Sequence, residues 1–204
     1  ELLHKKIEEV DVCDAHVVAL DGSSKVSYQD IALYSLYENN QFQIAAIDSH
    51  ITHKSPPPFA AHFVEIEVDT ETGKIKVLKY VAAVDCGTAI NPQLCEGQTE
   101  GALLNGISYA LTEEYRFDAN GRMTNPSFSS YNIFSMRDKP EIKSIIVPSY
   151  EETGPFGAKS VSEISINGAM PAIANALYNA TGARIYKAPF TQERVWRAIQ
   201  ETKK

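Results

Sequence analysis

The sequence predicts an α+β fold, with a largely antiparallel sheet and helices packed against it. Strand and helix patterns are mixed without the regular strand–helix–strand alternation of a parallel sheet, and the strand signals come mainly as hairpins. The chain has 204 residues and is 44% hydrophobic and 22% charged, a composition that suits folding around a core. We expect an N-terminal α+β segment over residues 1–55, continuing from sequence upstream, and a C-terminal α+β domain over residues 56–204.

The N-terminal segment combines short strands with helices. The expected elements are an exposed helix over 2–9, strands over 17–20 and 25–28, a helix over 28–39 and a strand over 41–51. Ser27 can cap the second helix, and Asp30 places negative charge at its positive end. The prolines of residues 53–58 fix their own φ angles and restrict the residues before them, so an extended linker should follow.

The C-terminal domain opens with the clearest hairpin of the sequence. Residues 63–69 and 74–85 flank a turn, and the alternation HFVEIEVD places Val64, Ile66 and Val68 on one face. The later elements are a helix over 92–111 capped by Asn91, a hairpin over 115–123, a strand over 143–147, a helix over 169–181 closed by Gly182, and a helix from Thr191 to about Thr202.

Charge and hydropathy exclude several classes of partner. The net charge of −7 is spread along the chain, which argues against a nucleic-acid surface or a polybasic membrane patch. No run of about eighteen apolar residues and no signal-like leader is present. We therefore expect no nucleic acid, no membrane and a cytoplasmic location.

Cysteines and histidines show no standard metal-binding pattern. Cys13, Cys86 and Cys95 are odd in number and lack CxxC spacing, which favours reduced, buried thiols over disulfides or zinc ligands. The histidines around the proline tract are His50, His53 and His62, with Asp48 nearby. Their spacing favours scattered surface histidines over a zinc site.

Two short stretches could carry chemistry. The glycine-punctuated loop from Gly154 leads into an apolar helix and carries Lys159 and Glu163. A carboxylate in a dry, apolar pocket is a usable general base because its pKa can rise toward neutrality. Glu163 could equally pair with Lys159, four residues earlier.

The second stretch is GQTEG, which sets the amide of Gln98 between Gly97 and Gly101. An amide both donates and accepts hydrogen bonds, and glycines let a polar ligand approach the backbone closely. A helix packed tightly through small residues explains the same glycines, and both interpretations stand at this point.

Four blocks of sequence together resemble a known family. They are Asp85-Cys86-Gly87 through Asn91-Pro92, GQTEGA at 97–102, GAKSVSE at 157–163 and PAIANAL at 171–177. The set is similar to the C-terminal part of the molybdopterin-binding subunit of the xanthine dehydrogenase and aldehyde oxidase family. The resemblance covers about residues 59–200, and residues 1–50 add little to it.

The resemblance implies a fold of the molybdenum-cofactor-binding type and a molybdenum hydroxylase activity. Glu163 matches the family's general base. The reaction of the family adds water-derived oxygen to a carbon of a purine-like N-heterocycle or an aldehyde. Gln98, beside Gly97, matches the glutamine that hydrogen-bonds the cofactor. In the family, a loop lies beside the cofactor, and Lys159, Ser160 and Ser162 match residues of that loop.

The cofactor implied is a molybdenum pterin, either molybdopterin or its cytosine dinucleotide. The pterin itself holds the metal in this family, so no residue of the chain is predicted as a metal ligand. The implied partners are the remainder of the molybdenum subunit and the domains or subunits that carry 2Fe-2S clusters and FAD.

The sequence departs from the family pattern next to the expected base. Ser162 stands where glycine is common, and Ile164 and Ser165 stand where prolines are frequent. Two rival interpretations stay open: a non-catalytic cofactor-binding or assembly module of the same fold, and a zinc-dependent hydrolase that would use His50, His53 or His62.

Overall fold

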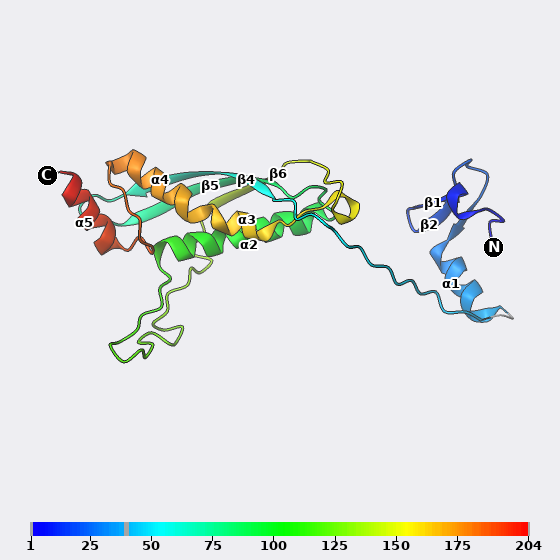
Figure 1. Ribbon diagram of the computed structural model, residues 1–204, viewed down its shortest axis with the longest axis horizontal. Helices are drawn as coiled ribbons and strands as arrows, with labels where there is room; N and C mark the ends of the chain where they lie inside the picture. Colours follow the sequence, from blue (N-terminus) through cyan, green and yellow to red (C-terminus); the bar gives the residue numbers. More distant parts are fainter. Residues whose placement is uncertain (1, 39–40, 204) are drawn as a thin grey trace. The chain divides into compact units, whose positions relative to one another are not determined.

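The computed structural model describes residues 2–38 and 41–203 (Figure 1). It divides into two units, Glu1–His50 and Ile51–Lys204, each of which is described on its own. Within the described part of the chain, no helix has the length and hydropathy that crossing a bilayer would require.

The N-terminal unit is a small antiparallel sheet followed by a helix. Its elements are η1 (Ile7–Glu9), β1 (Val10–Cys13), β2 (His16–Ala19), β3 (Lys25–Ser27) and α1 (Tyr28–Tyr37), with sheet order β1-β2-β3. Ser27 caps α1 as predicted, because its Oγ accepts a hydrogen bond from the backbone N–H of Asp30 at 3.1 Å.

Two predictions for this unit were wrong. The helix expected over 2–9 is only the short turn η1, and the strand expected over 41–51 is absent, because residues 41–51 have no regular structure and are exposed. A strand needs a hydrogen-bonded partner, and among the described residues none pairs with this stretch. The predicted end of α1 at residue 39 lies outside the described residues.

The sheet of the C-terminal unit has the order β4-β5-β6. The predicted hairpin is confirmed as β4 (Phe59–Val68) and β5 (Ile75–Asp85), which pair antiparallel from Phe59–Asp85 to Val68–Ile75. The third strand, β6 (Glu141–Ile146), lies parallel to β5. One face of the sheet is buried by helices, which places Val64, Ile66 and Val68 inward as the alternation predicts.

Helices cover this face of the sheet. They are α2 (Pro92–Leu111), the short α3 (Ser162–Asn167), α4 (Ala169–Thr181) and α5 (Gln192–Thr202), and Figure 1 shows α2, α3 and α4 running along the sheet. The predicted caps are confirmed at Asn91, Gly182 and Thr191. The loop expected from Gly154 instead contains the turn η2 (Pro155–Gly157) and then α3.

The chain between α2 and β6 projects away from the sheet (Figure 1). The predicted hairpin over 115–123 is reduced to a bridge between Phe117 and Met123, with Gly121 in the turn at a φ of 76°. The segment returns to the core near Phe134, whose backbone N–H donates to Ser108 Oγ of α2 at 3.0 Å.

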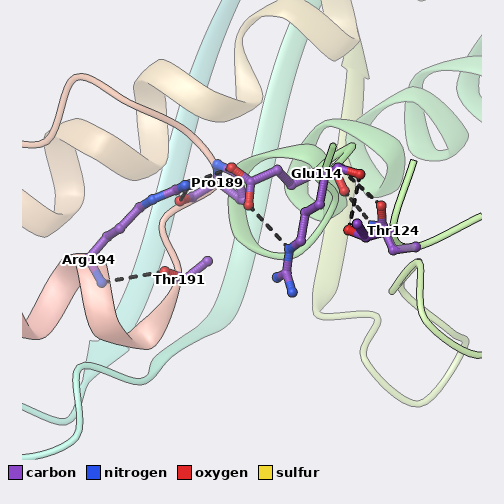
Figure 2. A network of polar contacts seen from close by, with 7 residues as sticks. Glu114, Thr124, Pro189, Thr191 and Arg194 are labelled. Carbon is purple, nitrogen blue, oxygen red and sulfur yellow. Dashed lines mark hydrogen bonds and ion pairs between the residues drawn. The ribbon is translucent and has the colours of Figure 1, made fainter. Parts of the chain in front are cut away.

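The core lies between the sheet and the helices. Its largest fully buried side chains include Tyr80, Leu103, Ile107, Ile173 and Leu177. At the far end of α2, a polar network secures α5 (Figure 2). Arg194 donates to Glu114 at 2.6 Å and to the Pro189 carbonyl at 2.9 Å. This network fixes the end of α2 that lies away from its N-terminal cap.

Candidate functional site

A pocket of about 320 Å³ opens between α2 and α3. Its lining residues come from two stretches of chain about sixty residues apart: Gly97, Gln98, Gly101, Ala102, Asn105, Ser162, Glu163 and Ile166. The fold thus brings together four of the predicted site residues, which are Gly97, Gln98, Ser162 and Glu163.

On the α2 side of the pocket, two glycines leave the helix backbone uncovered by side chains. Gly97 and Gly101 are four residues apart and share one helix face, and a Cβ added at either would meet no atom within 4 Å. Gly106 differs, because its Cβ would lie 2.5 Å from Ala169 Cβ and 2.7 Å from the Ile166 carbonyl oxygen. Tight helix packing therefore explains Gly106, whereas Gly97 and Gly101 leave backbone accessible to a ligand.

The α3 wall carries the predicted base. Glu163 lies in the first turn of α3 and is exposed, and Ser162 Oγ donates to Gln98 Oε1 at 3.3 Å across the pocket. Among the described residues, no hydrogen bond or ion pair engages the Glu163 carboxylate, so the pairing with Lys159 considered from the sequence is absent. The apolar enclosure expected for this base is not provided by these residues.

Lys159 is instead paired with Asp85 at the end of β5. Its ammonium Nζ lies 2.7 Å from Asp85 Oδ2 and 5.3 Å from the centre of the Phe59 ring, and its side chain is only 7% exposed. Asp85 also accepts hydrogen bonds from Ser149 Oγ and from the Gly87 N–H. Lys159 and the exposed Ser160 do not line the pocket.

These bonds keep the Asp85 carboxyl ionised. Burial alone would raise the pKa of Asp85, but the hydrogen bonds from Lys159, Ser149 and the Gly87 backbone lower it to about 2. Asp85 and Lys159 therefore form a partly buried ion pair, and Lys159 lies three residues before α3 begins.

Backbone pairing reinforces the ion pair. The Lys159 N–H donates to the Cys86 carbonyl and the Thr88 N–H to the Gly157 carbonyl, each at 2.7 Å. Gly87 has a φ of 68°, and a Cβ there would lie 2.2 Å from the Gly157 carbonyl oxygen. The segment that leads into α3 is thus attached along its backbone to the end of β5.

Replacing Asp85 by asparagine should destabilise the protein at pH 7 by on the order of 2 kcal/mol, because the buried Lys159 ammonium loses its counter-charge. The folded-state pKa of Asp85 lies below its ordinary 3.8, so this stabilisation is complete above that value and is lost as the pH falls toward 2. Denaturant titrations should show that the difference in free energy of unfolding between wild type and Asp85→Asn becomes smaller below about pH 4.

The matched control is Glu152→Gln, which neutralises an exposed carboxylate in the preceding loop. Its stability should follow that of the wild type at each pH. If the difference in free energy of unfolding between wild type and Asp85→Asn stayed constant from pH 7 to pH 2, the assignment of the ion pair would be contradicted.

The cysteines and histidines differ in part from expectation. Cys86 is buried, but Cys13 is exposed and Cys95 is only partly buried, so the prediction of buried thiols was wrong for Cys13. Burial and the nearby Cys95 thiol raise the pKa of Cys86. His62 is partly buried rather than on the surface, and no cluster of three potential metal ligands occurs among residues 2–38 and 41–203.

One residue of the pocket and one residue that supports the segment leading to it were missed from the sequence. Asn105 lines the pocket, and its position four residues after Gly101 and eight after Gly97 would have placed it on the same helix face. Asp85 carries no comparable local signal, because its partner Lys159 lies 74 residues away in sequence.

Comparison with known proteins finds relatives over nearly the whole chain. Residues 1–140 match the family model of the molybdopterin cofactor-binding domain. The chain is 36% identical over 202 residues to "Probable hypoxanthine oxidase XdhD" of Escherichia coli (strain K12), covering 98% of this chain and 21% of that protein. It is 32% identical over 199 residues to the xanthine dehydrogenase molybdenum-binding subunit of Escherichia coli O157:H7, covering 96% and 26%.

A solved structure supports the fold. Quinoline 2-oxidoreductase from Pseudomonas putida 86 superposes with a TM-score of 0.77 at 23% identity, over 98% of this chain and 27% of that chain. The similarity to the family extends further than the expected range of about residues 59–200, because the family model and the alignments also include the N-terminal unit. The residues around Glu163 lie beyond the family-model match.

The chain spans 21% and 26% of the lengths of the two curated relatives described above. The similarity to a molybdenum-binding subunit that the four sequence blocks predicted is confirmed over nearly the whole chain. With more than half of its residues matched by the family model, this chain belongs to the molybdopterin cofactor-binding domain family.

Proposed function

We propose that this chain is the C-terminal molybdopterin-binding portion of a xanthine-dehydrogenase-like molybdenum hydroxylase. The observation that carries the proposal is the pocket between α2 and α3, which unites Gln98 with Ser162 and Glu163 beside two open glycines. Family membership supplies the class of cofactor, and the pocket supplies polar groups and accessible backbone where such a group could bind.

The residues present suit a pterin cofactor. The Gln98 amide can donate and accept hydrogen bonds, Ser162 offers a hydroxyl, and Gly97 and Gly101 allow close approach to the α2 backbone. A Cβ at either glycine would enter the space that a ligand would use. When bound, the cofactor supplies the two-electron redox chemistry that adds water-derived oxygen to carbon.

Glu163 is the proton acceptor in this proposal. A general base must reach the proton it removes and be shielded from bulk water. Because Glu163 is exposed in this chain, the rest of the molybdenum subunit has to complete the enclosure. Electrons would leave through partner domains or subunits that carry 2Fe-2S clusters and FAD.

The names of the relatives support one substrate class for this proposal. The similarity to a protein named as a hypoxanthine oxidase favours a purine-like N-heterocycle, with aldehydes as the second class. A screen of both classes with dye-coupled oxidation, applied to the intact complex after its molybdenum assay, tests this assignment.

Replacing Gly101 by valine should prevent cofactor loading, because Gly101 lines the pocket and a Cβ there would meet no neighbouring atom within 4 Å, so the added side chain would occupy ligand space. We expect the purified whole protein to lose most of its molybdenum and pterin while its circular dichroism stays unchanged. The control, Gln93→Val, places the same side chain on an exposed part of α2 outside the pocket. Full molybdenum and pterin content in Gly101→Val would refute binding at this wall.

A further inference from the structure

We propose that His62 and Tyr80 are positioning residues for Glu163, which they serve by holding the C-terminal end of α3. The inference rests on the proposed function, since it assigns a task to residues outside the pocket. His62 lies on β4 and Tyr80 on β5, and both contact Gly168, the residue that joins α3 to α4.

A chain of hydrogen bonds links the sheet to this junction. The Tyr80 hydroxyl donates to the Gly168 carbonyl at 3.3 Å, and His62 Nδ1 lies 3.1 Å from the same hydroxyl. Burial raises the pKa of Tyr80, so the phenol keeps its proton. His62 Nδ1 and the Tyr80 hydroxyl are thus hydrogen-bonded, and the histidine tautomer sets which of the two atoms donates.

The His62 ring also fills the space beside Gly168. A Cβ on Gly168 would lie 2.1 Å from His62 Cδ2 and Nε2, so no larger residue fits without moving the ring. On its other side, the same junction packs on Gly106 of α2 through Ile166 and Ala169. The end of α3 is therefore held between a sheet residue and a helix residue.

The His62 ring is partly buried between the sheet and α3. Its Nε2 atom is buried and meets no partner within strict hydrogen-bond geometry in the described part of the chain, but the Ile164 backbone lies beside the ring. Burial lowers the pKa of His62, opposed in part by the nearby Ile164 carbonyl. An apolar side chain would fill the same volume but could not make the hydrogen bond between His62 Nδ1 and the Tyr80 hydroxyl.

The position of Glu163 depends on this support. The helix that carries it has only six residues, and helices shorter than about 12 residues are marginal without tertiary contacts. Glu163 precedes Gly168 by five residues, so a shift of the junction moves the carboxylate relative to Gln98. A misplacement near 1 Å can cost about 10²-fold in rate.

The test compares His62→Leu, His62→Asn and Tyr80→Phe in the full-length, cofactor-loaded protein. Leucine fills the volume without polar atoms, whereas asparagine can place an amide N–H near the position of Nδ1. We expect His62→Leu and Tyr80→Phe to lower kcat per molybdenum by about tenfold or more, with KM within about twofold of the wild type. His62→Asn should recover most of the lost kcat.

Hydrogen exchange supplies a readout that is independent of turnover. Amides of residues 162–168 should exchange at least about tenfold faster in His62→Leu and Tyr80→Phe, while residues 172–181 of α4 keep their wild-type rates. Tyr80→Phe removes a single oxygen atom, so it still tests the positioning role if His62→Leu fails to fold.

Wild-type kcat per molybdenum in Tyr80→Phe, or in a folded His62→Leu, would overturn the inference even if the melting temperature falls. Glu163→Gln is measured in parallel to separate the two hypotheses. If Glu163→Gln loses turnover and the His62 and Tyr80 variants do not, the positioning role alone fails. If Glu163→Gln keeps normal turnover, the role of Glu163 as proton acceptor fails, and the positioning role fails with it.

Discussion

Replacing Glu163 by glutamine is expected to preserve molybdenum content in the assembled protein and to lower turnover by about 10²-fold or more. Glutamine keeps the size and hydrogen-bonding reach of the side chain but cannot accept the proton. Since Glu163 makes no ion pair or hydrogen bond among the described residues, its loss should leave the fold unchanged. Metal analysis and steady-state kinetics on the same preparation measure both quantities.

The matched control for this experiment is Glu96→Gln, which makes the same change on α2, one residue before Gly97 and outside the pocket. It should turn over normally. Near-normal turnover of Glu163→Gln would remove Glu163 from the mechanism. Absence of molybdenum and pterin from the intact complex would favour the rival hypothesis, a cofactor-binding or assembly module without chemistry.

Replacing Gly87 by alanine should lower the free energy of unfolding by about 3 kcal/mol. Two costs combine at this position. A left-handed backbone costs roughly 1–2 kcal/mol once a Cβ is present, and overpacking typically adds about 1–3 kcal/mol. The added Cβ would strike the Gly157 carbonyl oxygen, which belongs to the segment that leads to Lys159. Urea titration of the purified protein measures the loss.

Gly121→Ala separates the two costs. Gly121 has a φ of 76°, close to the 68° of Gly87, but a Cβ there meets no atom within 4 Å. It should therefore show only the backbone cost of roughly 1–2 kcal/mol. Equal losses in the two variants would mean that the Gly157 carbonyl moves aside freely and that the pairing at Gly87 is not rigid.

Local sequence signals predicted the elements with strong boundaries. Asn91 ahead of Pro92, Gly182 and Thr191 marked helix ends correctly because caps act within one turn of chain. The alternation of β4 predicted which face is buried, because the period of two is a property of the strand itself.

The secondary-structure predictions failed where contacts between residues distant in sequence determine the structure. The helix α3 is too short to show a periodic pattern, and it forms where it packs on Gly106 and beside His62. The parallel pairing of β6 with β5 depends on a partner more than fifty residues away in sequence. The stretch 41–51 has the composition of a strand but no partner among the described residues.

The candidate site was predictable only in part, for the same reason. The glycines of GQTEG allowed either ligand approach or tight helix packing, and the family pattern indicated both Gln98 and Glu163. The ion pair of Lys159 with Asp85, and the contact of His62 with Gly168, join residues far apart in sequence. No local pattern encodes such contacts, and they became apparent only from the coordinates.

The projecting chain between α2 and β6 gives this fold room for engineering. Because Asp118 to Gly121 form an exposed turn, while the pocket is built from the first half of α2 and from α3, extra residues at Asn120 would not pass through the pocket or the core. An affinity tag or a spectroscopic label inserted there would report on the assembled protein and leave the spacing of Gln98 and Glu163 intact.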